Sequence, residues 1–116
     1  MASSPKPYLR SDRVSDRVHH ILANIFIKEY PVNYCDLVTV TKVEVTRNLR
    51  LAKIYLSFIG ADIGPDEIIK LISNDIKHIR YLLGKELDLK YVPDIKFYYD
   101  KAIKNIDNMN SILRKI

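Results

Sequence analysis

Cysteine, glycine and long apolar runs are all scarce in this sequence. The single cysteine, Cys35, has no partner for an internal disulfide bond, which fits a reducing cytoplasm, and we interpret it as a small filler before a strand. No apolar run approaches the roughly 18 residues of a membrane-spanning helix, and residues 1–10 lack the apolar segment of a signal peptide. We therefore expect a cytoplasmic protein without a membrane partner.

The residue patterns of metal sites and enzymes are missing as well. His19 and His20 are neighbours that point to different sides of a helix, and neither they nor His78 has a cysteine or histidine partner at ligand spacing. The sequence has no Gly-x-Ser-x-Gly elbow, no glycine loop for phosphate and no nucleophile beside an activating base. We expect no metal, no cofactor, no small-molecule substrate and no catalytic residue. An enzyme that uses Ser15, Asp16 and His19, or Asp75 and His78, is the weaker alternative.

Positive charge is what the chain has in excess. Its 116 residues include 19 Lys and Arg against 14 Asp and Glu, which gives a formal net charge of +5. An apolar fraction of 47% is ordinary for a globular protein, and a chain of this length predicts one domain that buries roughly two-thirds of its unfolded surface. The charge by itself favours a polyanionic partner, either a nucleic acid or an anionic membrane surface. A membrane is disfavoured because the apolar face of the first predicted helix is needed to cover the protein's own core.

The repeat SDRVSDRV at residues 11–18 has nearly the period of an α-helix, so equivalent side chains lie one above another. We expect Ser11 to cap this helix and Pro31 to end it near Glu29. Residues 1–10 are expected to form a flexible N-terminal segment. A basic stripe runs beside an apolar stripe that consists of Val14, Val18, Ile21, Leu22, Ile25 and Phe26.

Two strands are predicted after this helix. Residues 37–45 and 51–59 are rich in β-branched residues and alternate apolar with polar positions. The short link between them predicts an antiparallel hairpin. A slip in the apolar phase of the first strand predicts a bulge near Thr41 and Lys42.

A second helical region is predicted over residues 65–86, where apolar residues keep a helical spacing. Its middle contains poor helix formers, which predict a kink or two helices that share a face. The kink residues are Ser73, Asn74, Asp75, Ile76 and Lys77. Residues 94–99 predict a third strand, and residues 101–116 form a C-terminal tail that is either a weak helix or frayed.

The element order is therefore α-β-β-α-α-β, which predicts an α+β domain whose three-stranded sheet carries its helices on one face. Type II KH domains use this order, so we expect a KH-like RNA-binding domain over residues 11–100. KH domains usually clamp single-stranded RNA with a Gly-x-x-Gly turn between the two middle helices. Gly60, Gly64 and Gly84 lie elsewhere, so this motif is absent.

Two stretches carry the most specific motifs: VTVTKVEVTRNLRLAKIY at residues 38–55 and IRYLLGKELDLKYVPDIKFYYD at residues 79–100. They resemble the ribosome-binding factor A family, and the resemblance extends over most of the chain. The family has an acidic residue where this chain has Asn48, and an arginine before the third strand where it has Lys90. The Ala-x-Gly kink of the family falls on residues 75–77, which contain no glycine here.

The resemblance implies a non-enzymatic assembly factor of the small ribosomal subunit. Such factors bind immature or newly joined small subunits, contact their ribosomal RNA and leave before translation. They support late maturation and processing of that RNA, notably in the cold, alongside assembly GTPases. We expect the same of this chain, acting as a monomer. The alternative is a generic single-stranded RNA-binding KH-like module that is not tied to the ribosome.

Exposed cations are the candidate RNA contacts, because Arg and Lys pair with phosphate oxygens and release counterions. The first-helix stripe consists of Arg10, Arg13, Arg17, His20 and Lys28. The hairpin group consists of Lys42, Arg47, Arg50 and Lys53. The third group consists of Lys77, Arg80, Lys85 and Lys90. The alternative for each group is a solvated surface, and for Arg80 an anchor to a nearby carboxylate. Packing is favoured over base stacking for Tyr91, Tyr98 and Tyr99.

Overall fold

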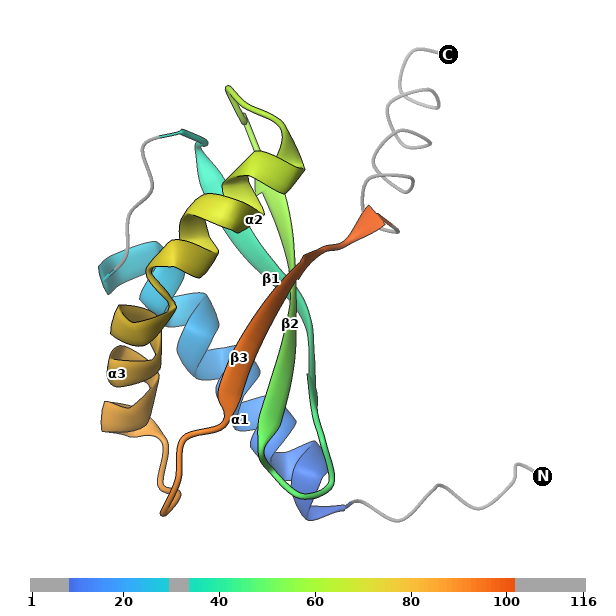
Figure 1. Cartoon of the computed structure of the whole chain (residues 1–116), viewed down its shortest axis with the longest axis vertical. Helices are drawn as coiled ribbons and strands as arrows, with labels where there is room; N and C mark the ends of the chain where they lie inside the picture. The colour runs from blue at the N-terminus through green and yellow to red at the C-terminus, as the bar shows by residue number, and fades with distance from the viewer. Residues whose placement is uncertain (1–8, 30–33, 102–116) are drawn as a thin grey trace, which may run out of the picture.

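The computed structural model describes residues 9–29 and 34–101, and its elements follow the predicted order (Figure 1). They are α1 (Arg10–Asn24), a π-helical turn η1 (Ile25–Glu29), β1 (Leu37–Val45), β2 (Leu51–Ile59), α2 (Pro65–Asn74), α3 (Ile76–Glu86) and β3 (Asp94–Tyr99). The α+β, KH-like fold class is thereby confirmed. The predictions for most of the two terminal segments lie outside the described residues.

The start of α1 differs from the prediction. Ser11 is not the N-cap; Leu9 is, and its backbone N–H donates to the Asp12 carboxylate at 3.0 Å. Arg10, expected in the flexible N-terminal segment, is the first residue of the helix. Ser11 is the second residue of the helix and is buried. The Ser11 carbonyl accepts a hydrogen bond from Ser15 Oγ at 2.8 Å. Ser15 Oγ in turn accepts a hydrogen bond from the Val45 N–H at 2.9 Å.

The three strands form one mixed sheet in the order β1-β2-β3. β1 and β2 pair antiparallel from Leu37↔Ile59 to Val45↔Ala52, which confirms the hairpin. The register shifts between Val40 and Lys42, so the predicted bulge is confirmed. The intervening Thr41 donates a hydrogen bond from Oγ1 to the Asp100 carboxylate at 2.6 Å. β3 pairs parallel with β2 and is the third strand of the sheet.

The helices cover one face of the sheet, where the hydrophobic core lies (Figure 1). Val18 of α1, Ile54 of β2 and Ile79 of α3 are fully buried there. Cys35 is buried beside them, and burial, followed by the charge of Asp36, raises the pKa of its thiol. A buried thiol of raised pKa fits the predicted filler. None of the helices in residues 9–29 and 34–101 is long and apolar enough to cross a membrane.

The second helical region is divided where its sequence is poor in helix formers. α2 ends at Asn74 and α3 begins at Ile76. Asp75 stands between them with φ −101° and ψ 19°, and its N–H donates to the Ile72 carbonyl at 3.0 Å. The division occurs without glycine, because Ser, Asn and Asp side chains compete with the helix for backbone hydrogen bonds.

Candidate nucleic-acid interface

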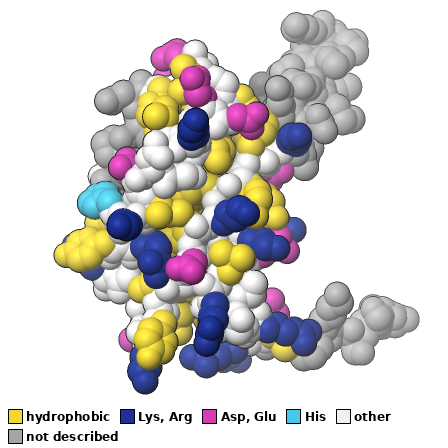
Figure 2. Space-filling view, viewed as in Figure 1, with side chains coloured by type: hydrophobic (Ala, Val, Ile, Leu, Met, Phe, Trp, Pro, Cys, Tyr) yellow, Lys and Arg dark blue, Asp and Glu magenta, His cyan; other side chains and the backbone are white. Residues whose placement is uncertain are grey.

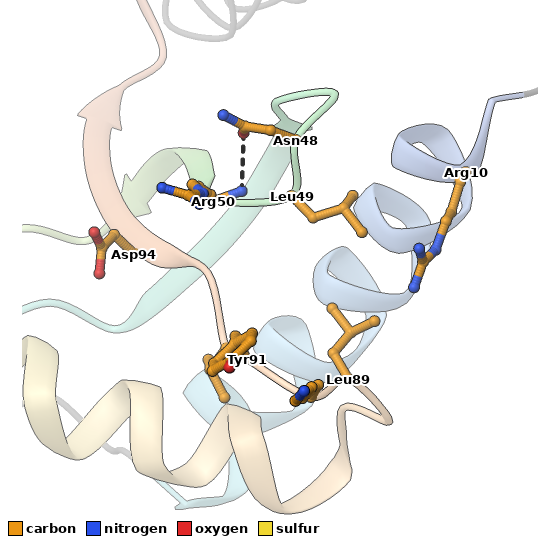
Figure 3. Close-up of a pocket in the computed structure, with 9 residues that line it drawn as sticks. Arg10, Asn48, Leu49, Arg50, Leu89, Tyr91 and Asp94 are labelled. Atoms are coloured by element: carbon orange, nitrogen blue, oxygen red, sulfur yellow. Dashed lines mark hydrogen bonds between the residues drawn. The ribbon is translucent and has the colours of Figure 1, made fainter.

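Three segments that are distant in the sequence meet at the lower end of Figure 1: the start of α1, the β1–β2 turn and the link from α3 to β3. An open cavity of about 600 Å³ lies among them, and we call it the loop-end cavity (Figure 3). It is lined by Arg10, Asn48, Leu49, Arg50, Leu89, Lys90, Tyr91, Val92 and Asp94. The structure thus brings together one predicted contact from each of the three groups.

The β1–β2 turn is held by its own side chains. Asn48 Oδ1 accepts a hydrogen bond from Thr46 Oγ1 at 2.6 Å. It accepts a second one from the Arg50 backbone N–H at 3.1 Å (Figure 3). Leu49 has a φ of +60°, which is uncommon for a residue other than glycine. Its side chain points toward α1 and packs against the core (Figure 3). This packing offsets the backbone strain and leaves the Arg50 side chain exposed at the cavity.

The link from α3 to β3 is fastened to the body of the protein. Arg80 donates from Nε to the Pro93 carbonyl at 3.2 Å and from Nη2 to the Val92 carbonyl at 2.8 Å. A Cβ on Gly84 would lie 2.9 Å from Val92 Cγ2, so the glycine permits this close approach. The Asp94 N–H donates to the carbonyl of residue 50 at 2.8 Å, which joins the link to the β1–β2 turn.

The cavity is electropositive. It contains the cations of Arg10, Arg50 and Lys90 and one carboxylate, that of Asp94. Asp94 already lies 3.7 Å from Arg80 Nη2, which partly neutralises it. Lys and Arg side chains predominate over the lower part of the face shown in Figure 2. Guanidinium and ammonium groups around an open hollow bind anions, and phosphates above all.

Tyr91 adds an aromatic surface to the rim of this cavity. Its side chain is 75% exposed, so the expected packing is wrong for Tyr91. Lys90 Nζ lies 5.5 Å from the centroid of its ring. For Tyr98 and Tyr99 the packing prediction is confirmed, because both are partly buried and stack on Tyr55 and Phe58 respectively.

The first-helix stripe is exposed along α1 and, at Lys28, on η1, but its members differ in their partners. Arg13, His20 and Lys28 are exposed. Arg17 donates from Nη2 to the carbonyl of Glu86 at 3.0 Å, at the C-terminal end of α3. This bond joins two helices and satisfies a carbonyl that has no partner within α3. Arg17 therefore has a structural part whether or not it also contacts RNA.

The structure separates the hairpin group into two places. Arg47 and Arg50 lie at the β1–β2 turn, close to the cavity, whereas Lys42 and Lys53 lie along the strands. Lys42 Nζ is 3.8 Å from the Glu44 carboxylate, an exposed ion pair. The predicted strand bounds, 37–45 and 51–59, already place Arg47 and Arg50 in the link and Lys42 and Lys53 in the strands.

The third group is divided as well. Lys77 and Lys85 are exposed on α3, and Lys85 Nζ lies 5.3 Å from the centroid of Tyr81. Arg80 has its guanidinium bonded to the two link carbonyls. The Asp94 carboxylate lies 3.7 Å from Arg80 Nη2, farther than the Val92 and Pro93 carbonyls. Arg80 is therefore better described as an anchor, held mainly by backbone carbonyls, than as an RNA contact.

Comparison with known proteins identifies the family of this chain. The model of the family described as "Ribosome-binding factor A" matches residues 10–113. The chain belongs to the ribosome-binding factor A family. A family member from Geotalea uraniireducens is 32% identical over 109 residues, which cover 94% of this chain and 89% of that protein.

Solved structures of ribosome-binding factor A share the fold. The crystal structure from Thermus thermophilus has a TM-score of 0.66 at 15% identity, covering 77% of this chain and 94% of that one. A Thermus thermophilus RbfA homology model, fitted into a cryo-electron-microscopy map of a 30S–RbfA complex, has a TM-score of 0.62 at 15% identity, covering 75% and 91%. At this identity the likeness shows the fold alone.

Proposed function

We propose that this member of the ribosome-binding factor A family binds the small ribosomal subunit and its ribosomal RNA through the loop-end cavity and the exposed cations around it. The observation that carries the proposal is the convergence of Arg10, Arg50 and Lys90 from three separate segments on one open hollow. Family membership supports the choice of partner, as does the fold shared with a protein fitted into a map of a 30S–RbfA complex.

The proposed action is binding without catalysis. Arginine forks fit phosphate oxygens, and each neutralised phosphate releases counterions, so affinity should fall steeply with salt. Binding of this kind stabilises one conformation of the RNA during late maturation and processing, including in the cold, where RNA misfolds persistently. Assembly GTPases are proposed partners in the same step, and the protein acts as a monomer.

Co-sedimentation with purified small subunits tests the proposal. The Arg50→Gln variant should bind roughly tenfold more weakly, since a hydrogen bond to a charged group contributes about 1.5 kcal/mol. Its plot of log affinity against log salt should be shallower by about 0.7–0.9. Lys70→Gln, which removes the same charge from α2 at the other end of the molecule, is the matched control and should bind as the unaltered protein does.

Large subunits and joined ribosomes separate the proposal from its alternative. The protein should sediment with free small subunits more than with either of them. Equal recovery with large subunits would leave a generic RNA-binding module as the better description. Equal affinity and salt dependence in Arg50→Gln and Lys70→Gln would remove the loop-end cavity from the interface.

A further inference from the structure

The sheet has a second face, opposite the helices, which no described helix covers. Inner side chains such as Ile54 and Phe97 are buried under the helices, whereas the alternate positions point the other way. We call this side the outer sheet face. Its central side chains are Lys42, Glu44, Lys53, Tyr55, Lys96 and Tyr98.

The strand register arranges these side chains in two rows, each of which crosses all three strands. The rings of Tyr55 and Tyr98 stack with centroids 5.3 Å apart and planes inclined by 23°. Lys42 Nζ lies 5.8 Å from the Tyr55 centroid, and Lys96 Nζ lies 5.6 Å from the Tyr98 centroid. Each ring of the stack therefore has an ammonium group beside it.

The neighbouring row places two like charges directly opposite each other. Lys53 of β2 pairs with Lys96 of β3. Like charges at such positions destabilise a sheet. Glu44, which faces Lys53 from β1, is engaged with Lys42 at 3.8 Å and with the Tyr55 hydroxyl. Burial, and then this hydrogen bond, raise the pKa of Tyr55. An anion between the two lysines would relieve their repulsion.

We infer that the outer sheet face is a binding site for single-stranded RNA. Phosphates bind between Lys53 and Lys96, and unpaired bases stack on the Tyr55–Tyr98 pair. Stacking tolerates any base because every base has a π-face, and flanking lysines follow the backbone. A duplex keeps its bases stacked on one another and offers this face its phosphates only. The inference rests on the proposed RNA-binding function and names a second site for it.

Other occupants fit this face less well. Residues 102–116 of the same chain contain Lys104, Arg114 and Lys115 against Asp107 alone, so their charge has the same sign as that of the face. An anionic membrane would attract the lysines and would accept tyrosines at its interface, but it offers no planar base to stack on their rings. Single-stranded RNA uses both the charges and the rings.

Fluorescence anisotropy with a labelled uridine decamer, and with a labelled RNA duplex of the same length, tests the inference. Tyr98→Leu should weaken decamer binding roughly 5- to 100-fold, which is the contribution of one stacked base, and should leave duplex binding unchanged. Tyr98→Phe keeps the ring and should retain binding of the decamer. Lys96→Gln, at an exposed position that should not affect folding, should weaken decamer binding and make it less dependent on salt.

The outcomes distinguish this site from the loop-end cavity. Circular dichroism first establishes that each variant is folded. Unchanged decamer affinity in both Tyr98→Leu and Lys96→Gln would overturn the inference, as would equal losses for decamer and duplex in Tyr98→Leu. If Arg50→Gln alone weakens decamer binding, single strands bind at the loop-end cavity and only the outer sheet face is refuted. Vesicles with anionic lipid that displace the decamer, with no effect of Tyr98→Leu, would favour a membrane instead.

Discussion

Asn48 organises the β1–β2 turn with one uncharged oxygen, which accepts hydrogen bonds from Thr46 and from the backbone of Arg50. A carboxylate would accept the same two bonds, so Asn48→Asp should change the free energy of unfolding by less than about 0.5 kcal/mol. The added negative charge lies beside Arg50 and should weaken small-subunit binding. Urea denaturation and co-sedimentation measure the two effects.

Asn48→Ala is the matched control, because it removes the hydrogen bonds and adds no charge. It should cost about 1 kcal/mol of stability, as the loss of a side-chain cap does. If Asn48→Asp instead binds subunits as tightly as the unaltered protein while remaining stable, the charge of the turn is irrelevant to binding. Asn48 would then be equivalent in binding to the acidic residue that the family has at this position.

Sequence predicts which cations are exposed better than it predicts what they contact. Arg10, Arg50 and Lys90 are exposed, as their residue types suggest. Arg17 and Arg80 are on equally polar stretches, yet both donate to backbone carbonyls of distant segments. Every residue has a backbone carbonyl, so residue types and spacing do not indicate which carbonyls accept these bonds.

At the scale of elements, Arg80 fastens α3 to the link that leads into β3. Arg80→Gln should lower the free energy of unfolding by about 1–2 kcal/mol, because two carbonyls lose a charged donor. The exposed pair with Asp94 adds little to this loss. Among folded molecules, the salt dependence of small-subunit binding should stay as it is. Urea denaturation and a salt series of co-sedimentation provide both measurements.

Lys77→Gln serves as the comparison on the same helix, since its side chain is exposed, and it should alter stability by less than about 0.5 kcal/mol. A stable Arg80→Gln protein with a shallower salt dependence would show that the guanidinium contacts phosphate rather than the link. Arg80 would then join the cations of the interface.

The strands were predictable because alternation and β-branched residues report directly on a half-buried sheet. Even the bulge at Thr41 is visible as a slip in the apolar phase. The N-cap of α1 could not be predicted in this way. Serine is a preferred N-cap residue and leucine is not, yet Leu9 and not Ser11 occupies the N-cap position. Ser11 is buried, and Ser15, which donates to the Ser11 carbonyl, accepts the N–H of Val45 in β1. These contacts depend on the tertiary structure.

At the scale of the whole molecule, the loop-end cavity and the outer sheet face are neighbours. Asp94 lines the cavity, and Lys96 follows two residues later on the same strand. Arg50 precedes β2, and Tyr55 lies five residues further along the chain, or about 16 Å at the rise of a strand. One RNA strand that leaves the cavity along β2 and β3 would therefore meet the paired lysines and then the stacked tyrosines.

A double variant tests whether the two surfaces act on one RNA. Sites more than about 10 Å apart contribute additively to free energy when both are engaged. The Arg50→Gln and Tyr98→Leu losses in small-subunit affinity should therefore multiply in the combined variant. The shallower salt dependence should come from Arg50→Gln alone, since a tyrosine releases no counterion. A combined variant no weaker than the worse single one would contradict additivity and would mean that the loss of one contact already removes the other.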